Sequence, residues 1–264
     1  MNRLKKLTKI RDNLKQGGLS IGSWMQIPSS TVAEVMGDSG YDWIAIDLEH
    51  GSFSINMLPD IFRALELGDT LPLVRLLSGS PEECKQVLDA GAGGVIIPMI
   101  ESSEQLKKVR DSCRWPPSGN RGVAFSRANL FGKNFNNYIE EAQNPFLVAM
   151  IENIKAVDDL SSILKVGGLD AILIGPYDLS ASMGIISEFE NPKFIKIMDQ
   201  IYSLSKEAGI PCGVHIVDPM LNDLIKRIEE GYRFLPYSID SVFLNKSVVN
   251  PINSIDIEII KPNN

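Results

Sequence analysis

The fold is decided by the stretch Tyr41-Asp-Trp-Ile-Ala-Ile-Asp-Leu-Glu-His50. Its apolar run over 43–46 is typical of a strand that is buried on both faces. The run then turns polar at Asp47, Glu49 and His50. Because α/β proteins present their functional residues at the carboxyl ends of buried parallel strands, the stretch predicts a parallel α/β fold with a functional strand end here.

Asp47 and His50 suit acid–base chemistry at that strand end. A carboxylate three residues before a histidine is an arrangement that can orient a general base. The alternative is a salt-bridged strand end with no catalytic role. The chain has only two histidines, and one of them lies here, which favours the general-base interpretation.

Seven further apolar runs follow the same rhythm on either side of this strand. The eight predicted strands are 19–26, 43–49, 71–76, 94–100, 146–152, 170–175, 210–216 and 233–239. Helical patterns separate them, which is typical of parallel βαβ units. A (β/α)8 barrel needs about 250 residues. We therefore predict an α/β fold, a (β/α)8 TIM barrel, with a single domain over 1–264.

Two segments depart from the alternation. The segment 115–144 is rich in turn residues and asparagine, and insertions of this length are often functional lids or interface arms. The segment 241–264 is expected to form a last helix and a tail.

Composition excludes several classes of protein. The net charge of −7 argues against a nucleic-acid partner, which would favour a basic face. No apolar run approaches the ~18 residues of a membrane helix, and no apolar signal segment follows the start. The three cysteines are widely spaced and odd in number, which suits a reducing compartment. We expect a cytoplasmic protein without membrane contact.

Carboxylates follow two neighbouring predicted strands. Glu152 ends the fifth strand and Asp178 follows the sixth. Two carboxylate oxygens, completed by water and substrate, are the usual ligands of Mg²⁺ or Mn²⁺. The alternative is that each carboxylate caps the helix that follows it.

Arg75 lies at the end of an otherwise apolar strand, where a buried guanidinium requires a partner. It pairs either with Asp47 or Glu49, or with a substrate carboxylate. No predicted strand ends in a lysine, so Schiff-base chemistry is not indicated. No glycine-rich turn follows the last two strands, which argues against phosphorylated substrates.

These residues resemble the HpcH/HpaI family of divalent-metal-dependent class II pyruvate aldolases. The most specific matches are Asp-Leu-Glu-His-Gly over 47–51 and Gly-Pro-Tyr-Asp-Leu-Ser over 175–180. Other matching pieces lie at 22–24, 41–46, 72–75, 89–99, 116–122, 150–152 and 168–174. The pieces occur in the family's order over nearly the whole chain.

The resemblance implies a role for each catalytic candidate. Glu152 and Asp178 match the family's metal ligands, with Mg²⁺ or Mn²⁺ expected and Co²⁺ as a further candidate. His50 matches its catalytic base, and Asp47 matches the residue that orients this base. Arg75 matches the arginine that holds the pyruvate part of the substrate and the enolate.

The resemblance also implies how a small 2-oxo acid substrate binds and how the chain assembles. Trp24 matches an aromatic residue at the substrate pocket. The turn of Gly175, Pro176 and Tyr177 is expected near the substrate carboxylate. The implied assembly is a homo-oligomer, a hexamer or trimer of dimers, with the last helix exchanged between subunits.

The implied reaction is cleavage of a 4-hydroxy-2-oxo acid to pyruvate and an aldehyde through an enolate. Met150 replaces a glutamine that is common in the family, and His215 stands where an apolar residue is usual. These departures keep open a carbon–carbon bond-forming synthase that uses an oxo-acid or acyl-CoA enolate. A non-catalytic binding barrel is a third class, but it predicts an incomplete set of site residues. His215 itself is either structural or a second catalytic histidine.

Overall fold

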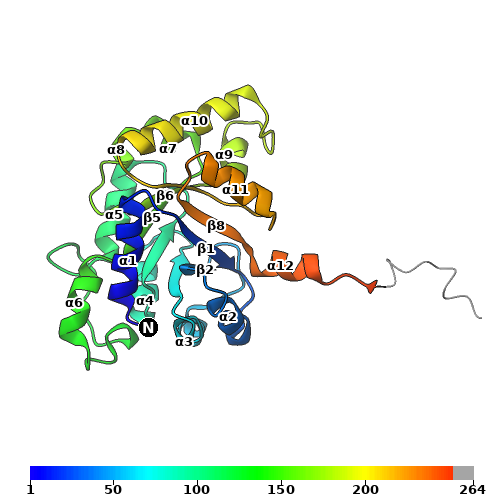
Figure 1. The fold of residues 1–264 in the computed structure, drawn as a ribbon. Coiled ribbons are helices and arrows are strands. Elements are labelled where there is room, and N and C mark those ends of the chain that lie inside the picture. The colour runs from blue at the N-terminus through cyan, green and yellow to red at the C-terminus, as the bar shows by residue number, and fades with distance from the viewer. Residues whose placement is uncertain (252–264) are drawn as a thin grey trace, which may run out of the picture.

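The computed structural model describes residues 1–251, and these form a barrel of eight parallel strands (Figure 1). The strands are β1 (Ser20–Met25), β2 (Trp43–Asp47), β3 (Leu71–Arg75), β4 (Gly94–Ile97), β5 (Phe146–Ile151), β6 (Ala171–Ile174), β7 (Cys212–Val214) and β8 (Phe234–Ile239). Neighbours in sequence pair in parallel, and β1 pairs with β8. The TIM-barrel prediction is confirmed.

The seam between β7 and β8 completes the ring through backbone hydrogen bonds. Arg233 N donates to Cys212 O at 2.9 Å, and Ile216 N donates to Pro236 O at 3.0 Å. Every predicted strand coincides with an observed one. Several predicted strands run on past the observed carboxyl end, because the polar residues that follow already belong to turns.

Helices alternate with the strands around the barrel. They are α1 (Arg3–Lys15), α2 (Ser30–Gly37), α3 (Leu58–Leu67), α4 (Pro81–Ala90), α5 (Ser103–Cys113), α6 (Phe135–Gln143), α7 (Ile154–Asp158), α8 (Leu160–Ile163), α9 (Pro176–Ser182), α10 (Pro192–Glu207), α11 (Leu221–Glu229) and α12 (Asp240–Ser247). Two 3-10 turns, Ile55–Met57 and Arg127–Asn129, are labelled η1 and η2. Side-chain caps begin many of the helices, as at Ser80, which accepts a hydrogen bond from Glu83 N.

Apolar side chains fill the barrel interior in alternation along the strands, as the two-residue period requires. Trp43 stacks on Phe234 with ring centroids 4.4 Å apart. Gly22 permits this, because a Cβ there would lie 2.1 Å from the Trp43 ring. Buried leucines and an isoleucine of α1 pack in the same cluster, which also holds residues near the amino ends of the strands. The interior is therefore a packed core, and only the carboxyl ends of the strands remain for a site.

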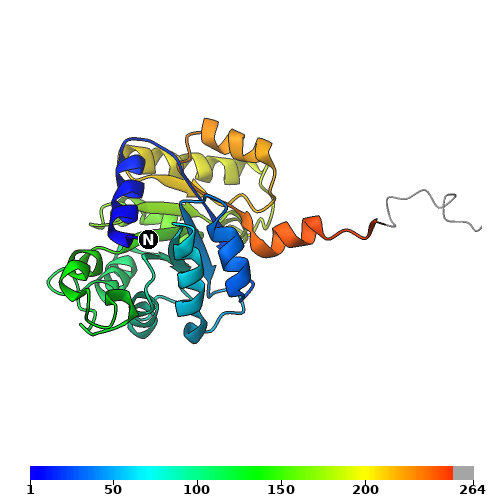
Figure 2. The same cartoon turned by 60° about the horizontal axis from the view of Figure 1, so that its bottom comes forward.

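The segment 115–144 contains regular structure that was not predicted, and its place argues against the lid, whereas the interface arm stays a prediction. It contains η2 and α6, and its own small core joins Trp115 to Tyr138. Because it connects the end of α5 to the start of β5, it lies at the amino ends of the strands, beside α1 (Figures 1 and 2). It therefore does not form a lid over the carboxyl ends of its own barrel.

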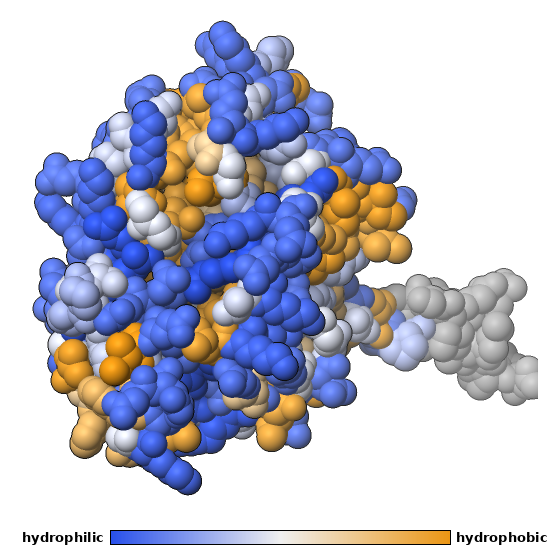
Figure 3. All heavy atoms as spheres, turned by 60° about the vertical axis from the view of Figure 1, so that its left-hand side comes forward, coloured by the Kyte–Doolittle hydropathy of each residue, from blue (hydrophilic) through white to orange (hydrophobic). Residues whose placement is uncertain are grey.

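Two more observations bear on the surface and on the end of the chain. Hydrophilic residues cover most of the face in Figure 3, and the apolar atoms there form separate patches. None of the helices within 1–251 is long and apolar enough to cross a membrane. The predicted last helix is present as α12, whereas the part of the predicted tail from 252 onward lies outside the described residues.

Candidate active site

The carboxyl ends of β2 and β3 bring Asp47 and Arg75 together. The two residues are direct partners in the strand register. Arg75 Nε donates to Asp47 Oδ1 at 2.8 Å, and Nη2 donates to Oδ2 at 2.7 Å. This bidentate geometry fixes the plane of the guanidinium as well as its position. The expectation that Arg75 pairs with a carboxylate of β2 agrees with this arrangement.

Asp47 is fully buried and remains a carboxylate. Burial opposes its ionisation. Nevertheless, the hydrogen bonds and charge of Arg75, with smaller contributions from Gln26 and the His50 backbone, lower the pKa of Asp47 below its usual value. Asp47 Oδ1 also accepts the backbone N–H groups of Glu49 and His50, each at 3.1 Å. Asp47 therefore shapes the turn after β2.

His50 differs from the prediction in how Asp47 contacts it. The carboxylate binds the backbone N–H of His50, and the imidazole is 62% exposed with Nε2 3.9 Å from Glu49 Oε2. A spacing of three residues lets a side chain cap its own turn, which explains the difference. The imidazole lies at the mouth of the barrel, with Glu49 as its neighbouring carboxylate.

Arg75 has further contacts that leave part of it available. Its Nη1 lies 3.1 Å from Glu49 Oε2, and its guanidinium carbon lies 4.5 Å from the centroid of the Trp24 ring. A guanidinium carries five N–H donors. Three of them face Asp47 and Glu49, so two remain without a partner among residues 1–251. Trp24 Nε1 is likewise buried without a hydrogen-bond partner in the described part of the chain.

Glu152 follows β5 and is 2% exposed. Its Oε1 accepts the backbone N–H of Met99 at 2.6 Å, and Met99 has a left-handed backbone with φ of 48°. Burial, with repulsion from Glu49 and Asp178, raises the pKa of Glu152 to about 7, against the opposing effects of Met99 and Arg75. The Glu152 carboxylate is therefore costly to ionise where it lies, first because it is buried and then because Glu49 and Asp178 are nearby.

Asp178 lies in the first turn of α9, which begins directly after Gly175. Gly175 occupies the N-cap position, and Asp178 also lies where the helix-terminus alternative places it, with its charge near the positive end of the helix dipole. A Cβ on Gly175 would lie 2.6 Å from Glu152 Oε2, so only glycine lets α9 begin this close to Glu152. Tyr177 is 52% exposed and packs edge-on against Phe189.

The donor set fits a divalent cation with few protein ligands. Glu152 and Asp178 repel each other, and Glu49 adds to the repulsion, which a cation between them would relieve. Within 1–251 no three His, Cys, Asp or Glu side chains are grouped to hold a metal. Two carboxylates, with water and substrate as the remaining ligands, suit Mg²⁺ or Mn²⁺ rather than Zn²⁺.

His215 follows β7 and tilts against Trp24, with ring centroids 5.6 Å apart. Burial, aided by the charge of Arg75, lowers the pKa of His215 to about 4, so the imidazole is neutral at pH 7. Its Nε2 lies 3.4 Å from Ser238 O. Met150 is buried in the barrel interior beneath these groups.

A cavity of about 740 Å³ adjoins the site rather than coinciding with it. It lies between α10 and α11, and its lining includes Pro176, Tyr177 and His215. Neither Arg75 nor Glu152 lines it. The catalytic candidates are therefore placed by hydrogen bonds and burial, and the cavity marks only one border of the site.

Two residues at the site were missed from the sequence. Gln26, which follows β1, donates to Asp47 Oδ2 at 2.9 Å. As a polar residue at the end of a predicted strand, it carried the same signal as the residues that were selected. Met99 acts through its backbone N–H, and no side-chain pattern indicates that.

Comparison with known proteins agrees with this arrangement of barrel and site. The model of the HpcH/HpaI aldolase/citrate lyase family matches residues 20–247. A hydroxypyruvate/pyruvate aldolase of Roseobacter denitrificans is 35% identical over 90% of this chain and 93% of its own. A 2-keto-3-deoxy-L-rhamnonate aldolase of Salmonella gallinarum is 34% identical over 90% of this chain and 89% of its own.

The fold matches as well. The crystal structure of a HpcH/HpaI aldolase/citrate lyase family protein from Burkholderia cenocepacia superposes with a TM-score of 0.87 and 27% identity, covering 93% of this chain and 98% of that one. The chain therefore belongs to the HpcH/HpaI aldolase/citrate lyase family, and the resemblance is confirmed. Divalent-metal dependence is the norm for the class II aldolases of this family.

Proposed function

We propose that the protein cleaves a 4-hydroxy-2-oxo acid to pyruvate and an aldehyde, with a divalent metal held by Glu152 and Asp178. The observation that carries the proposal is the Arg75–Asp47 pair, which leaves two guanidinium N–H groups unpaired within 1–251, on a guanidinium whose charge acts on the buried Glu152. Both similar aldolases support the class of reaction. The bound metal supplies Lewis-acid polarisation of the 2-oxo group.

Arg75 stabilises the charge that develops on the substrate. Its free N–H groups donate to the oxygen that becomes the enolate, and Asp47 keeps them from turning away. Trp24 lies against the guanidinium and limits its movement on another side. These groups are ordered before the substrate arrives, so little reorganisation is needed during the reaction.

His50 is the proposed base. Its exposed imidazole takes the proton of the 4-hydroxyl, the C3–C4 bond breaks, and its electrons form the enolate as the aldehyde departs. Glu49 stabilises the resulting imidazolium, since the two side chains already lie within 3.9 Å. Protonation of the enolate at C3 then gives pyruvate.

The turn of Gly175, Pro176 and Tyr177 is proposed to face the substrate carboxylate. It begins α9, where backbone N–H groups and the helix dipole favour an anion. Pro176 has no N–H and can only shape the turn. We propose Mg²⁺ or Mn²⁺ as the metal, with Co²⁺ as a further candidate, because oxygen ligands suit these ions.

We further propose a cytoplasmic homo-oligomer, a hexamer or trimer of dimers, in which α12 is exchanged. In both views α12 projects away from the barrel, and it exposes 55% of Leu244 (Figures 1 and 2). The three cysteines are buried free thiols, which suits a reducing compartment.

The test is pyruvate release from a panel of 4-hydroxy-2-oxo acids. The protein is stripped of metal with EDTA and then supplied with Mg²⁺, Mn²⁺ or Co²⁺. We expect pyruvate only after metal is restored, and the panel then identifies the aldehyde. No pyruvate from any member, with metal bound, would contradict the proposal and make acyl-CoA thioesters the next substrates to test for a synthase.

A further inference from the structure

Gln26 connects the Asp47–Arg75 pair to the beginning of α12. Its Nε2 donates to Asp47 Oδ2 at 2.9 Å, and its Oε1 accepts from Ser241 Oγ at 3.2 Å. A carboxylate can only accept hydrogen bonds, so the amide must turn its NH₂ toward Asp47 and its oxygen toward the hydroxyl. Both ends of the amide are therefore satisfied in one orientation only.

The backbone of Gln26 is fixed as firmly as its side chain. Gln26 N donates to Asp240 Oδ1 at 2.8 Å, and Ile27 N donates to Oδ2 at 2.9 Å. Asp240 is 5% exposed and is the first residue of α12. Its Oδ1 also accepts Ser241 N at 2.7 Å. The β8–α12 junction thus holds Gln26 by its main chain and by its amide.

Gln26 donates to Oδ2 of Asp47, which is the carboxylate oxygen with fewer hydrogen bonds. Asp47 Oδ1 accepts Arg75 Nε and the backbone N–H groups of Glu49 and His50. Within residues 1–251, Oδ2 accepts only Arg75 Nη2 and Gln26 Nε2. Among residues 1–251, Gln26 is the only side chain besides Arg75 that donates to Asp47. Without it, the one hydrogen bond that residues 1–251 still give Oδ2 comes from Arg75 itself, so the carboxylate and the guanidinium can turn together about Oδ1.

We propose that Gln26 is a positioning residue for the aldolase reaction, which bridges Ser241 to Asp47 and thereby holds Arg75 in the orientation that meets the enolate. The proposal rests on the proposed function of Arg75. Gln26 is expected to affect the transition state more than substrate binding. A tilted guanidinium still attracts the substrate by its charge, but its N–H groups no longer point at the enolate oxygen.

The first test compares Q26L with Q143L. Gln143 donates through its amide to Pro116 O at 3.0 Å, in the segment at the amino ends of the strands, so Q143L is a matched control for the chemical change. The assay is exchange of the methyl protons of pyruvate in D₂O, which needs the enolate but no aldehyde. We expect Q26L to lower the rate constant at saturation about 10-fold with KM changed less than about 3-fold. Q143L should match the wild type.

A binding measurement distinguishes a misoriented Arg75 from a general loss of structure in the variant. Oxalate is planar and dianionic like the pyruvate enolate, so calorimetry with metal-loaded protein reports on the same contacts. We expect its Kd to rise about 10-fold in Q26L and to stay unchanged in Q143L. Equal rate constants and equal oxalate affinity in Q26L and the wild type would overturn the proposal.

A double-mutant cycle then tests the bridge itself. S241A should lower the exchange rate about 3-fold by releasing the amide oxygen, and it should have no further effect in Q26L. Losses that multiply instead would mean that the two residues act separately, which would overturn the bridge.

A crystal structure of Q26L distinguishes failure of this inference from failure of the proposed function. If wild-type protein exchanges no methyl protons, the proposed function is wrong, yet the structure still tests the positioning. We expect the Arg75–Asp47 pair to be turned from its wild-type orientation relative to Glu152 and Trp24. An unchanged pair in Q26L would overturn the proposal irrespective of activity.

Discussion

Among single residues, Arg75 and Asp47 are the most important pair, because both the stability of the fold and the proposed reaction depend on them. Asp47 is fully buried and Arg75 nearly so, and the pair meets in bidentate geometry. Removing one member leaves the other charge buried without compensation, which typically costs about 3–5 kcal/mol. Loss of activity in R75A would therefore be confounded by loss of stability.

R75K is the sharper variant. The lysine keeps a positive charge but cannot supply two parallel N–H donors to Asp47 and a further donor to the substrate. We expect pyruvate methyl exchange to fall about 100-fold or more, as for loss of an oxyanion donor. Exchange rates alongside urea unfolding curves check this. Wild-type exchange by R75K would remove the directional role of Arg75.

Glu152 predicts a pH dependence of stability in metal-free protein. Its pKa of about 7 in the folded state is above the ordinary 4.5, so the folded protein binds this proton more tightly. The stabilisation is complete below the ordinary pKa and is lost as pH rises through 7, on the order of 3 kcal/mol in all. Unfolding curves with EDTA from pH 5 to 8 should show this loss.

E152Q is the control for that pH dependence, since glutamine does not titrate. Between pH 5 and 8, the free energy of unfolding of E152Q should fall less than that of the wild type. An identical slope in E152Q and the wild type would assign the dependence to other groups.

Sequence reasoning identified residues better than it identified their contacts. The polar residues at strand ends were found because apolar runs stop at them, and Asp47, Arg75 and Glu152 do lie there. The orientation of His50 was not predictable, because the same spacing serves a turn cap. Gln26 ends a predicted strand and carried the same local signal, but its contacts with β2 and α12 depend on the tertiary fold, so its role was not predictable.

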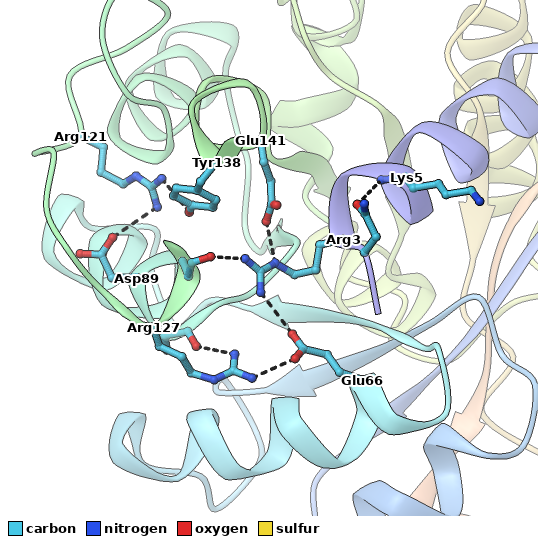
Figure 4. A network of polar contacts seen from close by, with 11 residues as sticks. Arg3, Lys5, Glu66, Asp89, Arg121, Arg127, Tyr138 and Glu141 are labelled. Carbon is cyan, nitrogen blue, oxygen red and sulfur yellow. Dashed lines mark hydrogen bonds and ion pairs between the residues drawn. The ribbon is translucent and has the colours of Figure 1, made fainter. Parts of the chain in front are cut away.

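At the scale of elements, α1 is tied to the segment 115–144 by an ionic network (Figure 4). Arg3 bonds Glu141 at 2.7 Å and Glu66 at 3.3 Å, and Arg127 bonds Glu66 at 2.9 Å. All four side chains are largely buried, so the network has little competition from water. It lies at the amino ends of the strands, opposite the site.

R3A should therefore lower stability without changing catalysis. We expect a loss of about 3 kcal/mol in the free energy of unfolding, with an unchanged rate of pyruvate exchange in the folded protein. R63A is the control, because Arg63 pairs with Asp60 in solvent and should contribute less than about 1 kcal/mol. Urea unfolding compares them. Equal stabilities of R3A and R63A would contradict the structural role of the network.

The start of α9 makes a second prediction at this scale. G175A places a Cβ 2.6 Å from Glu152 Oε2, which forces the carboxylate out of its present position beside the start of α9. Metal affinity, measured by calorimetry with Mn²⁺, should fall about 10- to 100-fold. G167A is the control, since a Cβ there would have no atom of the described chain within 4 Å apart from its chain neighbours. Unchanged Mn²⁺ affinity in G175A would argue against Glu152 as a ligand.

Elements were predictable where the local pattern was strong. The strands are continuous apolar runs, and α4 and α5 have clear capping residues, so their positions followed from sequence. The helix α6 was not predicted, because its asparagine-rich sequence has weak helix propensity. Packing of Tyr138 against Trp115 stabilises it, and this depends on the tertiary fold.

At the scale of the whole molecule, one end of the barrel gives stability and the other gives function. The helix α1 and the segment 115–144 lie at the amino ends, whereas the carboxylates and Arg75 lie at the carboxyl ends. The barrel itself was predictable, because eight apolar strand-like runs that alternate with helices in 264 residues favour a closed barrel over an open sheet. The place of the long segment was not, because length alone does not say to which end a connection belongs.

Stabilisation of a pyruvate enolate by these groups, with the help of a divalent metal, is the step on which the proposed reaction depends. The most direct measurement is exchange of the methyl protons of pyruvate for deuterium, followed by proton NMR. The protein is stripped with EDTA and then given back Mg²⁺ or Mn²⁺. We expect the exchange to be lost when the metal is stripped, restored when metal is added back, and absent in E152Q. No exchange by the metal-loaded wild type, or equal exchange by E152Q, would contradict this expectation.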